Sequence, residues 1–347
     1  AVPLPNLLAS LPLSAFALII VLAALYLRFH NLGTQSLWND EGSSFVQATR
    51  SFADIAANAA RDIHPPGYYW LLAAWRQFTG DSEFALRALS VFASVLTVAF
   101  TYATGRRLFG AFAGLIAALF VTLNTFNIYY AQEARMYALL ALWSAASLWI
   151  LAHILTSPRA LLPIHWRGVR GEVQWALALG LVNTAGLYTQ YAYPFVMLAQ
   201  AGIVLAWVLS SYQLPVTSRQ STSSLLNTAE PKTENRKLKT ENSVLGTFFL
   251  ANLLALLLFL PLLPTAWAQV TAWPNTGEAI PVGDALQTIF GWLAYGVTYA
   301  VTLPATLPYV PIFLAVGLAP FGAARPRWGR ILFPVIALLV IVGLFLV

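Results

Sequence analysis

Two adjacent carboxylic acids, Asp40 and Glu41, are the residues of this sequence best suited to chemistry. They follow Leu37 and Trp38 in a charged stretch, residues 28–66, that comes directly after an apolar one. Acids so close to a bilayer are costly unless they have a function. A carboxylate that is partly shielded from water can act as a general base toward a hydroxyl or an amine. We predict an extended or turning segment here, on which one acid is the base and its neighbour orients a substrate or binds a metal.

Polar residues that could bind an anionic substrate follow at the ends of later apolar segments. His64 precedes two prolines, which permit a helix to begin directly after it. The N-terminus of a helix favours phosphate. Arginine is always charged and matches phosphate geometry. We predict the following set of substrate-binding residues: His64, Arg87, Glu133, Arg135, Tyr137 and Gln190.

Each of these features also has a purely structural interpretation. Asp40 and Glu41 could be a solvated acid pair, although the preceding Trp38 would hold them at the membrane interface. Glu133 and Arg135 could satisfy each other at a helix end. The histidine could be an ordinary interfacial residue, and tyrosines near the end of a span are mostly anchors.

The composition is that of a membrane protein. The mean hydropathy is +0.69, 59% of the residues are hydrophobic and only 9% are charged. Apolar runs of about 17–22 residues recur along the chain, which is the length that crosses a hydrocarbon core. We therefore predict an all-α polytopic membrane protein, a bundle of about nine transmembrane helices. The absence of cysteine excludes disulfides, cysteine-ligated zinc and thiol catalysis.

The expected spans divide the chain into two membrane parts. They are residues 7–27, 84–104, 111–130, 137–155, 173–190, 193–212, 243–263, 303–322 and 331–347. Two shorter hydrophobic segments, 66–78 and 284–297, are flanked by acids and are expected to be interfacial helices in outer loops. We predict a catalytic module over residues 1–212, a flexible cytoplasmic linker over 213–242, and further spans over 243–347 with an outer loop at 264–302.

The distribution of charge predicts the orientation of the chain. With the N-terminus in the cytoplasm, 13 of the 19 basic residues fall on the cytoplasmic side. Nine of the 13 acids fall on the other side. Cytoplasmic loops carry an excess of lysine and arginine. We therefore expect a multi-pass protein of the plasma membrane whose acidic loop, residues 28–66, faces the extracytoplasmic side.

The ordered combination of polar motifs resembles that of a known family. The segments that carry the resemblance are Leu37–Glu41, His64–Tyr69, Phe84–Arg87, Gly105–Gly110 and Tyr129–Tyr137. Together they look like the GT-C glycosyltransferases, integral membrane enzymes, and in particular the protein O-mannosyltransferase-like proteins and the aminoarabinose lipid A transferases. The resemblance covers about residues 20–200, and the remainder agrees only in hydropathy.

The resemblance implies an inverting transfer of a sugar from a polyprenyl-phosphate carrier to an envelope protein, lipid or glycan on the outer face. It implies that Asp40 is the catalytic base, that Glu41 is its partner acid and that His64 lies near the donor phosphate. It places Glu133 and Arg135 in a second outer loop that lines the same cavity. Some relatives bind a divalent metal there, but this sequence offers no ligand set that would predict one.

Two features depart from the family pattern. Many relatives have Tyr-Thr-His-Tyr where this chain has Tyr188-Thr189-Gln190-Tyr191, and a glutamine cannot replace a cationic histidine. Relatives are also longer and often carry an outer C-terminal domain. A C-terminal truncation is one interpretation of a chain that stops at its ninth expected span.

Two other functions compete with that of an enzyme. A transporter or flippase would use the outer charges as a substrate vestibule, but transporters usually place ionisable groups near the midplane. A non-catalytic partner in an envelope assembly would differ only in activity. The sequence has no phosphate-binding loop and no dinucleotide fingerprint, so a nucleotide sugar is disfavoured as direct donor and no nucleic-acid partner is expected.

Overall fold

The computed structural model describes residues 12–156, 166–212 and 230–271, together with 281, 283, 284 and 288. Every regular element bounded within those residues is helical, which confirms the all-α prediction. The elements are α2 (Leu13–Phe29), α3 (Asn39–Ala48), α4 (Phe52–Ala59), α5 (Gly67–Thr79), α6 (Glu83–Phe109), α7 (Ala111–Leu123), α8 (Thr125–Ala131), α9 (Tyr137–Thr156), α10 (Trp166–Thr189), α11 (Tyr193–Tyr212), α12 (Glu230–Phe259), the short 3₁₀ helix η1 (Leu260–Leu262) and α13 (Leu263–Thr271).

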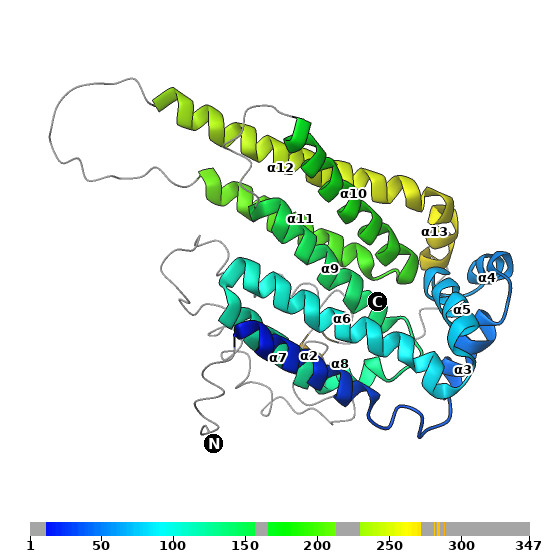
Figure 1. Ribbon diagram of the computed structural model, residues 1–347. Coiled ribbons are helices and arrows are strands. Elements are labelled where there is room, and N and C mark those ends of the chain that lie inside the picture. The colour runs from blue at the N-terminus through cyan, green and yellow to red at the C-terminus, as the bar shows by residue number, and fades with distance from the viewer. Residues whose placement is uncertain are drawn as a thin grey trace, which may run out of the picture.

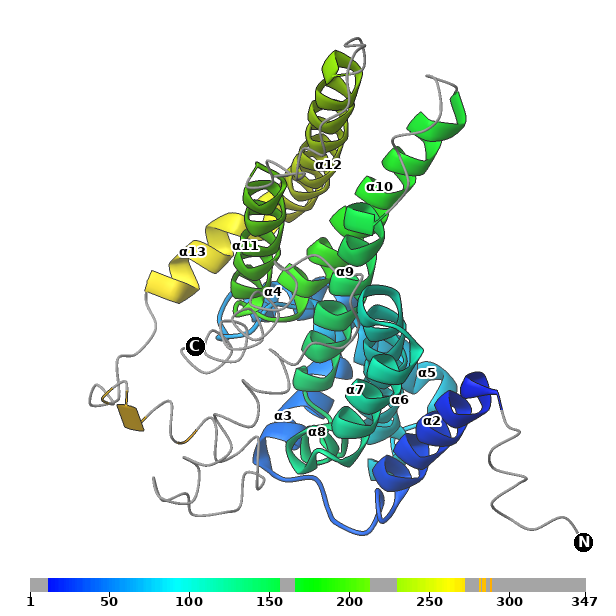
Figure 2. The same cartoon turned by 90° about the vertical axis from the view of Figure 1, so that its left-hand side faces the viewer.

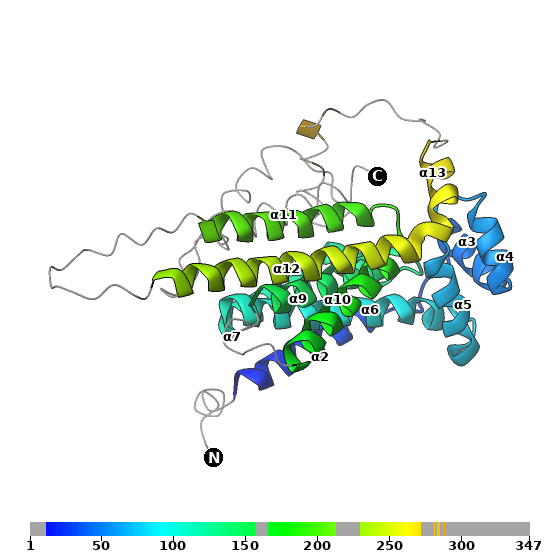
Figure 3. The same ribbon diagram turned by 90° about the horizontal axis from the view of Figure 1, so that it is seen from above.

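The long helices form a bundle, and the short helices gather at one end of it. Helix α6 packs against α7 and α9, α10 packs against α9 and α12, and α2 packs against α6 and α7. Helices α3, α4, α5 and α13 lie together at one end of the bundle (Figures 1 and 3). Figure 2 shows the long helices of the second part, α10, α11 and α12, extending away from the α2–α6–α7 group. The bundle thus presents a helical platform at one end.

Seven of the nine expected spans coincide with helices, but fewer are clear membrane spans. Among the described residues, three helices are long and apolar enough to cross a membrane: Glu83–Phe109, Tyr137–Thr156 and Ser243–Gln269. Two shorter apolar helices are Leu13–Phe29 and Tyr193–Leu209. The expected spans 303–322 and 331–347 lie outside the described residues, as does nearly all of the interfacial helix expected at 284–297.

The span expected at 111–130 is broken, which corrects the sequence interpretation. Helices α7 and α8 meet at an angle of 60°. Asn124 lies at the break, and its side chain accepts a hydrogen bond of 2.9 Å from the backbone N–H of Asn127. An asparagine in this position caps a new helix better than it continues an old one. Continuous hydropathy concealed the break.

Part of the linker expected over residues 213–242 is helical. Residues 213–229 lie outside the described residues, and residues 230–242 are the first turns of α12. Lysine and glutamate, which are frequent there, are good helix formers. At the other end of α12, Pro261 and Pro264 coincide with the change from α-helix to η1 and then to α13.

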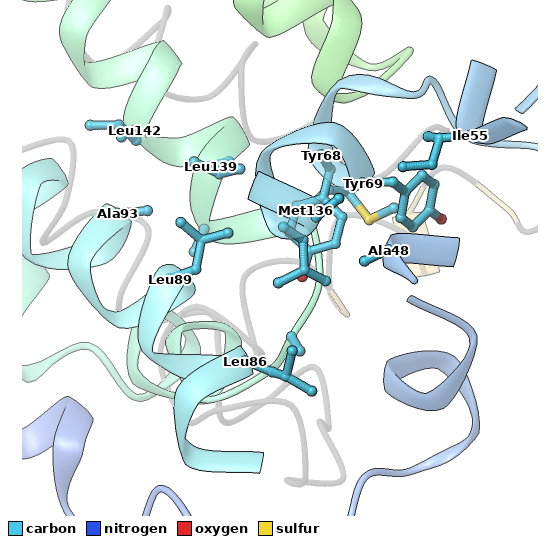
Figure 4. Close-up of a cluster of buried hydrophobic side chains, with 14 residues drawn as sticks. Ala48, Ile55, Tyr68, Tyr69, Leu86, Leu89, Ala93, Met136, Leu139 and Leu142 are labelled. Carbon is cyan, nitrogen blue, oxygen red and sulfur yellow. The ribbon is translucent and has the colours of Figure 1, made fainter. Parts of the chain in front are cut away.

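The charged stretch 28–66 is folded rather than extended. It contains α3 and α4, and α5 follows where an interfacial helix was expected. Buried side chains from α3, α5, α6 and the segment before α9 meet beneath it, among them Ala48, Tyr68, Leu86 and Met136 (Figure 4). Gly67 packs so closely that a Cβ there would lie 2.5 Å from the carbonyl oxygen of Tyr188. This core holds the platform against the bundle.

Candidate active site

Asp40 and Glu41 lie in the first turn of helix α3, whereas an extended or turning segment was predicted. Glu41 accepts a hydrogen bond of 3.4 Å from the backbone N–H of Trp38, which caps the helix. Acids in the first turn also complement the helix dipole. Successive residues of a helix point about 100° apart. Glu41 is therefore buried, with 1% exposure, whereas the Asp40 side chain is 40% exposed.

Glu41 is fully engaged in a buried ion pair with Arg87 of α6. Arg87 donates from Nε to Oε1 at 2.8 Å and from Nη2 to Oε2 at 2.7 Å. Arg87 also donates to the carbonyls of Leu32, Gln35 and Ser36. The pair ties α3 and the turn before it to α6.

The second outer turn is joined to the same acid. The backbone N–H of Ala134 donates to Glu41 Oε1 at 2.7 Å. This bond brings the segment 132–136 against α3, although Ala134 and Glu41 are 93 residues apart in sequence. It explains why Arg135 can reach the N-terminal end of α3.

Arg135 contacts both Asp40 and His64. Its Nη2 lies 3.5 Å from Asp40 Oδ2 and 3.3 Å from His64 Nε2. Its Nη1 donates to the Asp40 carbonyl at 3.3 Å and to Ser44 Oγ at 3.4 Å. The guanidinium carbon lies 5.9 Å from the centre of the Tyr137 ring, a cation–π contact. Arg135 is therefore the centre of the polar cluster.

The surroundings of His64 favour its neutral form. Burial and the charge of Arg135 lower its pKa, and Asp62, Asp40 and the side chain of Gln190 act in the opposite direction. Because a guanidinium can only donate, Nε2 must accept from Arg135, and the proton of the neutral ring is on Nδ1. The imidazole thus provides one acceptor already in use and one donor.

An open cleft of about 770 Å³ lies over this cluster. It runs along α3 and on to Arg50, and it is bounded on the other side by residues 62–64, with Tyr69 and Arg135 in its wall. Asp40, His64 and Arg135 all line it. Ten residues of helix correspond to about 15 Å, so the cleft has room beyond the charged cluster.

The remaining predicted residues lie beside or behind the cleft. Arg87 and Glu133 are buried and do not line it. Burial is the main cause that raises the Glu133 pKa, and Tyr129 acts in the opposite direction. Gln190 lies in the turn after α10, where its Oε1 accepts from the backbone N–H of Tyr191 at 3.0 Å. Of the eight predicted residues, the structure thus brings three together in the cleft.

Sequence reasoning missed several residues of this region. Ser44 contacts Arg135, and the hydroxyl of Tyr68 is buried beneath the cluster. Within the described ranges, neither the Tyr68 hydroxyl nor Arg135 Nε has a hydrogen-bond partner. A lone tyrosine in an aromatic run gives no signal in a sequence. Both atoms can donate a hydrogen bond.

The described residues do not provide for the divalent metal that some relatives bind. Glu41, the acid expected to support one, is neutralised by Arg87 at 2.7 Å. Across the described ranges, no three His, Asp or Glu side chains converge. Arg135 also occupies the space beside Asp40, and a cation there would repel it.

Comparison with known proteins supports the resemblance. The family model of dolichyl-phosphate-mannose-protein mannosyltransferases matches residues 63–222. Among solved structures, ArnT from Cupriavidus metallidurans superposes with a TM-score of 0.54 at 16% identity over 96% of this chain and 60% of the ArnT chain. This chain has the fold of the GT-C glycosyltransferases. The sequence interpretation of residues 37–137 is thereby confirmed at the level of the fold.

Two further GT-C structures show the range of the likeness. ArnT bound to undecaprenyl phosphate gives a TM-score of 0.52 at 17% identity, with the same shares of the two chains covered. The oligosaccharyltransferase AglB from Archaeoglobus fulgidus, in complex with an inhibitory peptide and a dolichol-phosphate, gives 0.51 at 14% identity. The match covers 96% of this chain but only 37% of the AglB chain. A search of curated protein sequences finds no significant match.

Proposed function

We propose that this chain is the catalytic membrane part of a glycosyltransferase that moves a sugar from a polyprenyl-phosphate carrier to an envelope acceptor with inversion. The observation that supports this most is the convergence of Asp40, His64 and Arg135 in one open cleft. The relatives whose structures hold undecaprenyl phosphate or a dolichol-phosphate point to the same class of donor.

In this proposal the donor phosphate binds to Arg135. Its Nε has no protein partner among the described residues, and its long contacts of 3.3–3.5 Å leave Nη1 and Nη2 free to reorient toward a phosphate. A charge-assisted bond to a phosphate would be shorter and stronger than these. The Nδ1 proton of His64 is a second donor to the same group.

The chemical step in this proposal assigns the proton to Asp40. A hydroxyl or amine of the acceptor attacks the anomeric carbon from the side opposite the phosphate and forms the new bond. The bond from that carbon to the phosphate oxygen breaks, and its electron pair leaves with the polyprenyl phosphate. The acceptor's proton passes to Asp40. Because the leaving phosphate is stabilised by Arg135, no strong general acid is required.

The other predicted residues act through these three. We assign Glu41 and Arg87 to holding α3 in place rather than to the donor phosphate, because their polar atoms are already paired. Tyr137 flanks Arg135 through its ring. Gln190 acts on His64, where it opposes the lowering of its pKa.

The proposal places the cleft on the extracytoplasmic face of the plasma membrane. The distribution of basic residues supports this orientation. Arg106 and Arg107, in the last turn of α6, lie about 28 Å along the helix from Arg87 by helical rise. The cleft and this basic pair are thus at opposite ends of one long helix.

A transporter remains the alternative, and the structure offers one feature for comparison. A polar network in the bundle joins Asn183, Gln200 and Asn252 with the hydroxyls of Tyr193 and Ser147. Its members are uncharged and bond to one another, as in networks that hold membrane helices together. A transport site would need polar groups left for a substrate.

The test of the proposal uses the purified chain in proteoliposomes with a labelled polyprenyl-phosphate sugar and an extract of envelope acceptors. The proposal predicts that the label leaves the lipid fraction and that unlabelled polyprenyl phosphate appears in equal amount. Movement of the intact donor between leaflets without cleavage would contradict the proposal and support the transporter. A nucleotide sugar in place of the lipid donor serves as control and should give no transfer.

A further inference from the structure

Arg28 is a buried cation that has no role in the proposed catalytic mechanism. It lies in the last turn of α2 with 0% exposure. No salt bridge of the described residues includes it. Burying a charge without a counter-ion is costly unless hydrogen bonds replace its water. The chain therefore has a specific use for this residue.

The guanidinium of Arg28 is bound by oxygens at the end of α7. Nη2 donates to the carbonyl of Val121 at 3.0 Å, and Nη1 donates to that of Thr122 at 3.2 Å. Nε donates to Ser94 Oγ of α6 at 2.7 Å. The last carbonyls of a helix have no N–H partner of their own. In a membrane such unpaired groups cost several kcal/mol. Arg28 thus supplies the donors that the break between α7 and α8 requires.

Gln132 makes the reverse connection. It follows α8 directly, and its Nε2 donates to the carbonyl of Arg28 at 3.2 Å and to that of His30 at 2.9 Å. These carbonyls belong to the end of α2. Arg28 of α2 therefore caps the C-terminal end of α7, and Gln132, which follows α8, caps the C-terminal end of α2. Helix α8, only seven residues long, is held at both ends.

We infer that Arg28 and Gln132 are positioning residues that set the place of Arg135 in the cleft. Gln132 is three residues before Arg135, in the turn whose arginine contacts Asp40 and His64. The angle of 60° between α7 and α8 fixes the direction in which the chain enters this turn. The inference rests on the proposed function for its effect on catalysis, but the geometry that it asserts is independent of that function.

The geometric arm of the test uses the absence of cysteine from the chain. Nitroxide labels at Phe112→Cys in α7 and Tyr129→Cys in α8, both exposed positions, report the angle between the two helices. We expect one narrow distance distribution, and a shifted or broadened one in Arg28→Met. Arg107→Met, which removes an arginine at the far end of α6, should leave it unchanged. An unchanged distribution in Arg28→Met would overturn the inference.

The catalytic arm uses Gln132→Ala, which removes the connection from Gln132 to the end of α2 and leaves the buried charge of Arg28 in place. Misplacement of a binding group by about 1 Å can cost on the order of a hundredfold. We expect a KM for the lipid donor raised about tenfold or more, together with a lower kcat because Arg135 also stabilises the leaving phosphate. We expect no effect of Gln77→Ala on the exposed face of α5. An unchanged KM would overturn the catalytic role. If the unaltered chain transfers no sugar, the proposed function fails. The label distances still test whether Arg28 holds the angle between α7 and α8.

Discussion

At the scale of the residue, helix geometry turns the side chains of the adjacent acids Asp40 and Glu41 in different directions. Asp40 faces the cleft, and Glu41 faces the core, where Arg87 neutralises it. The acid pair was recognisable from the sequence, but the roles predicted for its two members stay predictions. The partner of Glu41 was not recognisable, because Arg87 is 46 residues away and reaches it only through the packing of α3 on α6.

The Glu41–Arg87 pair predicts a large effect on stability. Glu41→Gln leaves the Arg87 charge buried without a counter-ion, and such changes typically cost about 3–5 kcal/mol. We expect a corresponding loss in the free energy of unfolding in detergent, followed by thermal or denaturant melting. Asp81→Asn is the matched control, because its pair with Arg76 is half exposed and should be worth less than about 1 kcal/mol. Equal losses in both variants would contradict the account.

His64 predicts the direction of a pH dependence. Its pKa in the folded chain is lowered, mainly by burial, from the ordinary value of 6.5. Between the lowered pKa and 6.5 the unfolded chain binds more protons, so stability should fall as pH decreases through this window. The measurement is the melting temperature against pH, compared with His64→Gln, in which this slope should vanish. His30→Gln, at the exposed end of α2, should keep the slope, and its loss there would argue against His64 as the source.

At the scale of the element, hydropathy located the helices and failed at their interruptions. The runs over 84–104 and 137–155 became α6 and α9 with longer ends. The break at Asn124 was missed, because it depends on a cap in α8 and on an arginine from α2 that no local pattern reveals. Helices α3 and α4 were missed as well, since short polar helices at an interface have no long apolar period.

Gly67 predicts how closely α5 must approach α10. An alanine Cβ there would lie 2.5 Å from the carbonyl oxygen of Tyr188, closer than atoms can pack, so α5 would have to move. We expect Gly67→Ala to lose about 1–3 kcal/mol of unfolding free energy. Gly202→Ala in α11 is the control, since its Cβ would meet nothing within 4 Å. A Gly67→Ala chain as stable as the control would contradict the packing described for α5.

At the scale of the whole molecule, the bundle separates a polar platform from a basic end. Helices α3, α4, α5 and α13 gather at the platform (Figure 3), and the last turn of α6 carries two arginines at the other end. The separation could be predicted from the sequence, because it follows from which segments between the apolar runs carry acids and which carry basic residues. The number of spans could not, since bent and short helices do not follow a rule of length.

Single cysteines test the proposed sidedness. Phe78→Cys lies at the end of α5 with 87% exposure, and Ser221→Cys lies in the segment expected to be cytoplasmic. A membrane-impermeant maleimide added to intact cells should label Phe78→Cys and should reach Ser221→Cys only after lysis. The reverse pattern would place the cleft in the cytoplasm and exclude the proposed site of action.

The base is the central claim, and Asp40→Asn tests it most directly. The amide keeps the size of the side chain and cannot accept the proton, so sugar transfer from the lipid donor should fall by about 10²–10⁴-fold. Binding of the donor should remain within a few-fold of the unaltered chain, because Arg135 and His64 are still present. Asp54→Asn on the exposed face of α4 should transfer sugar normally. Full transfer by Asp40→Asn would contradict the account.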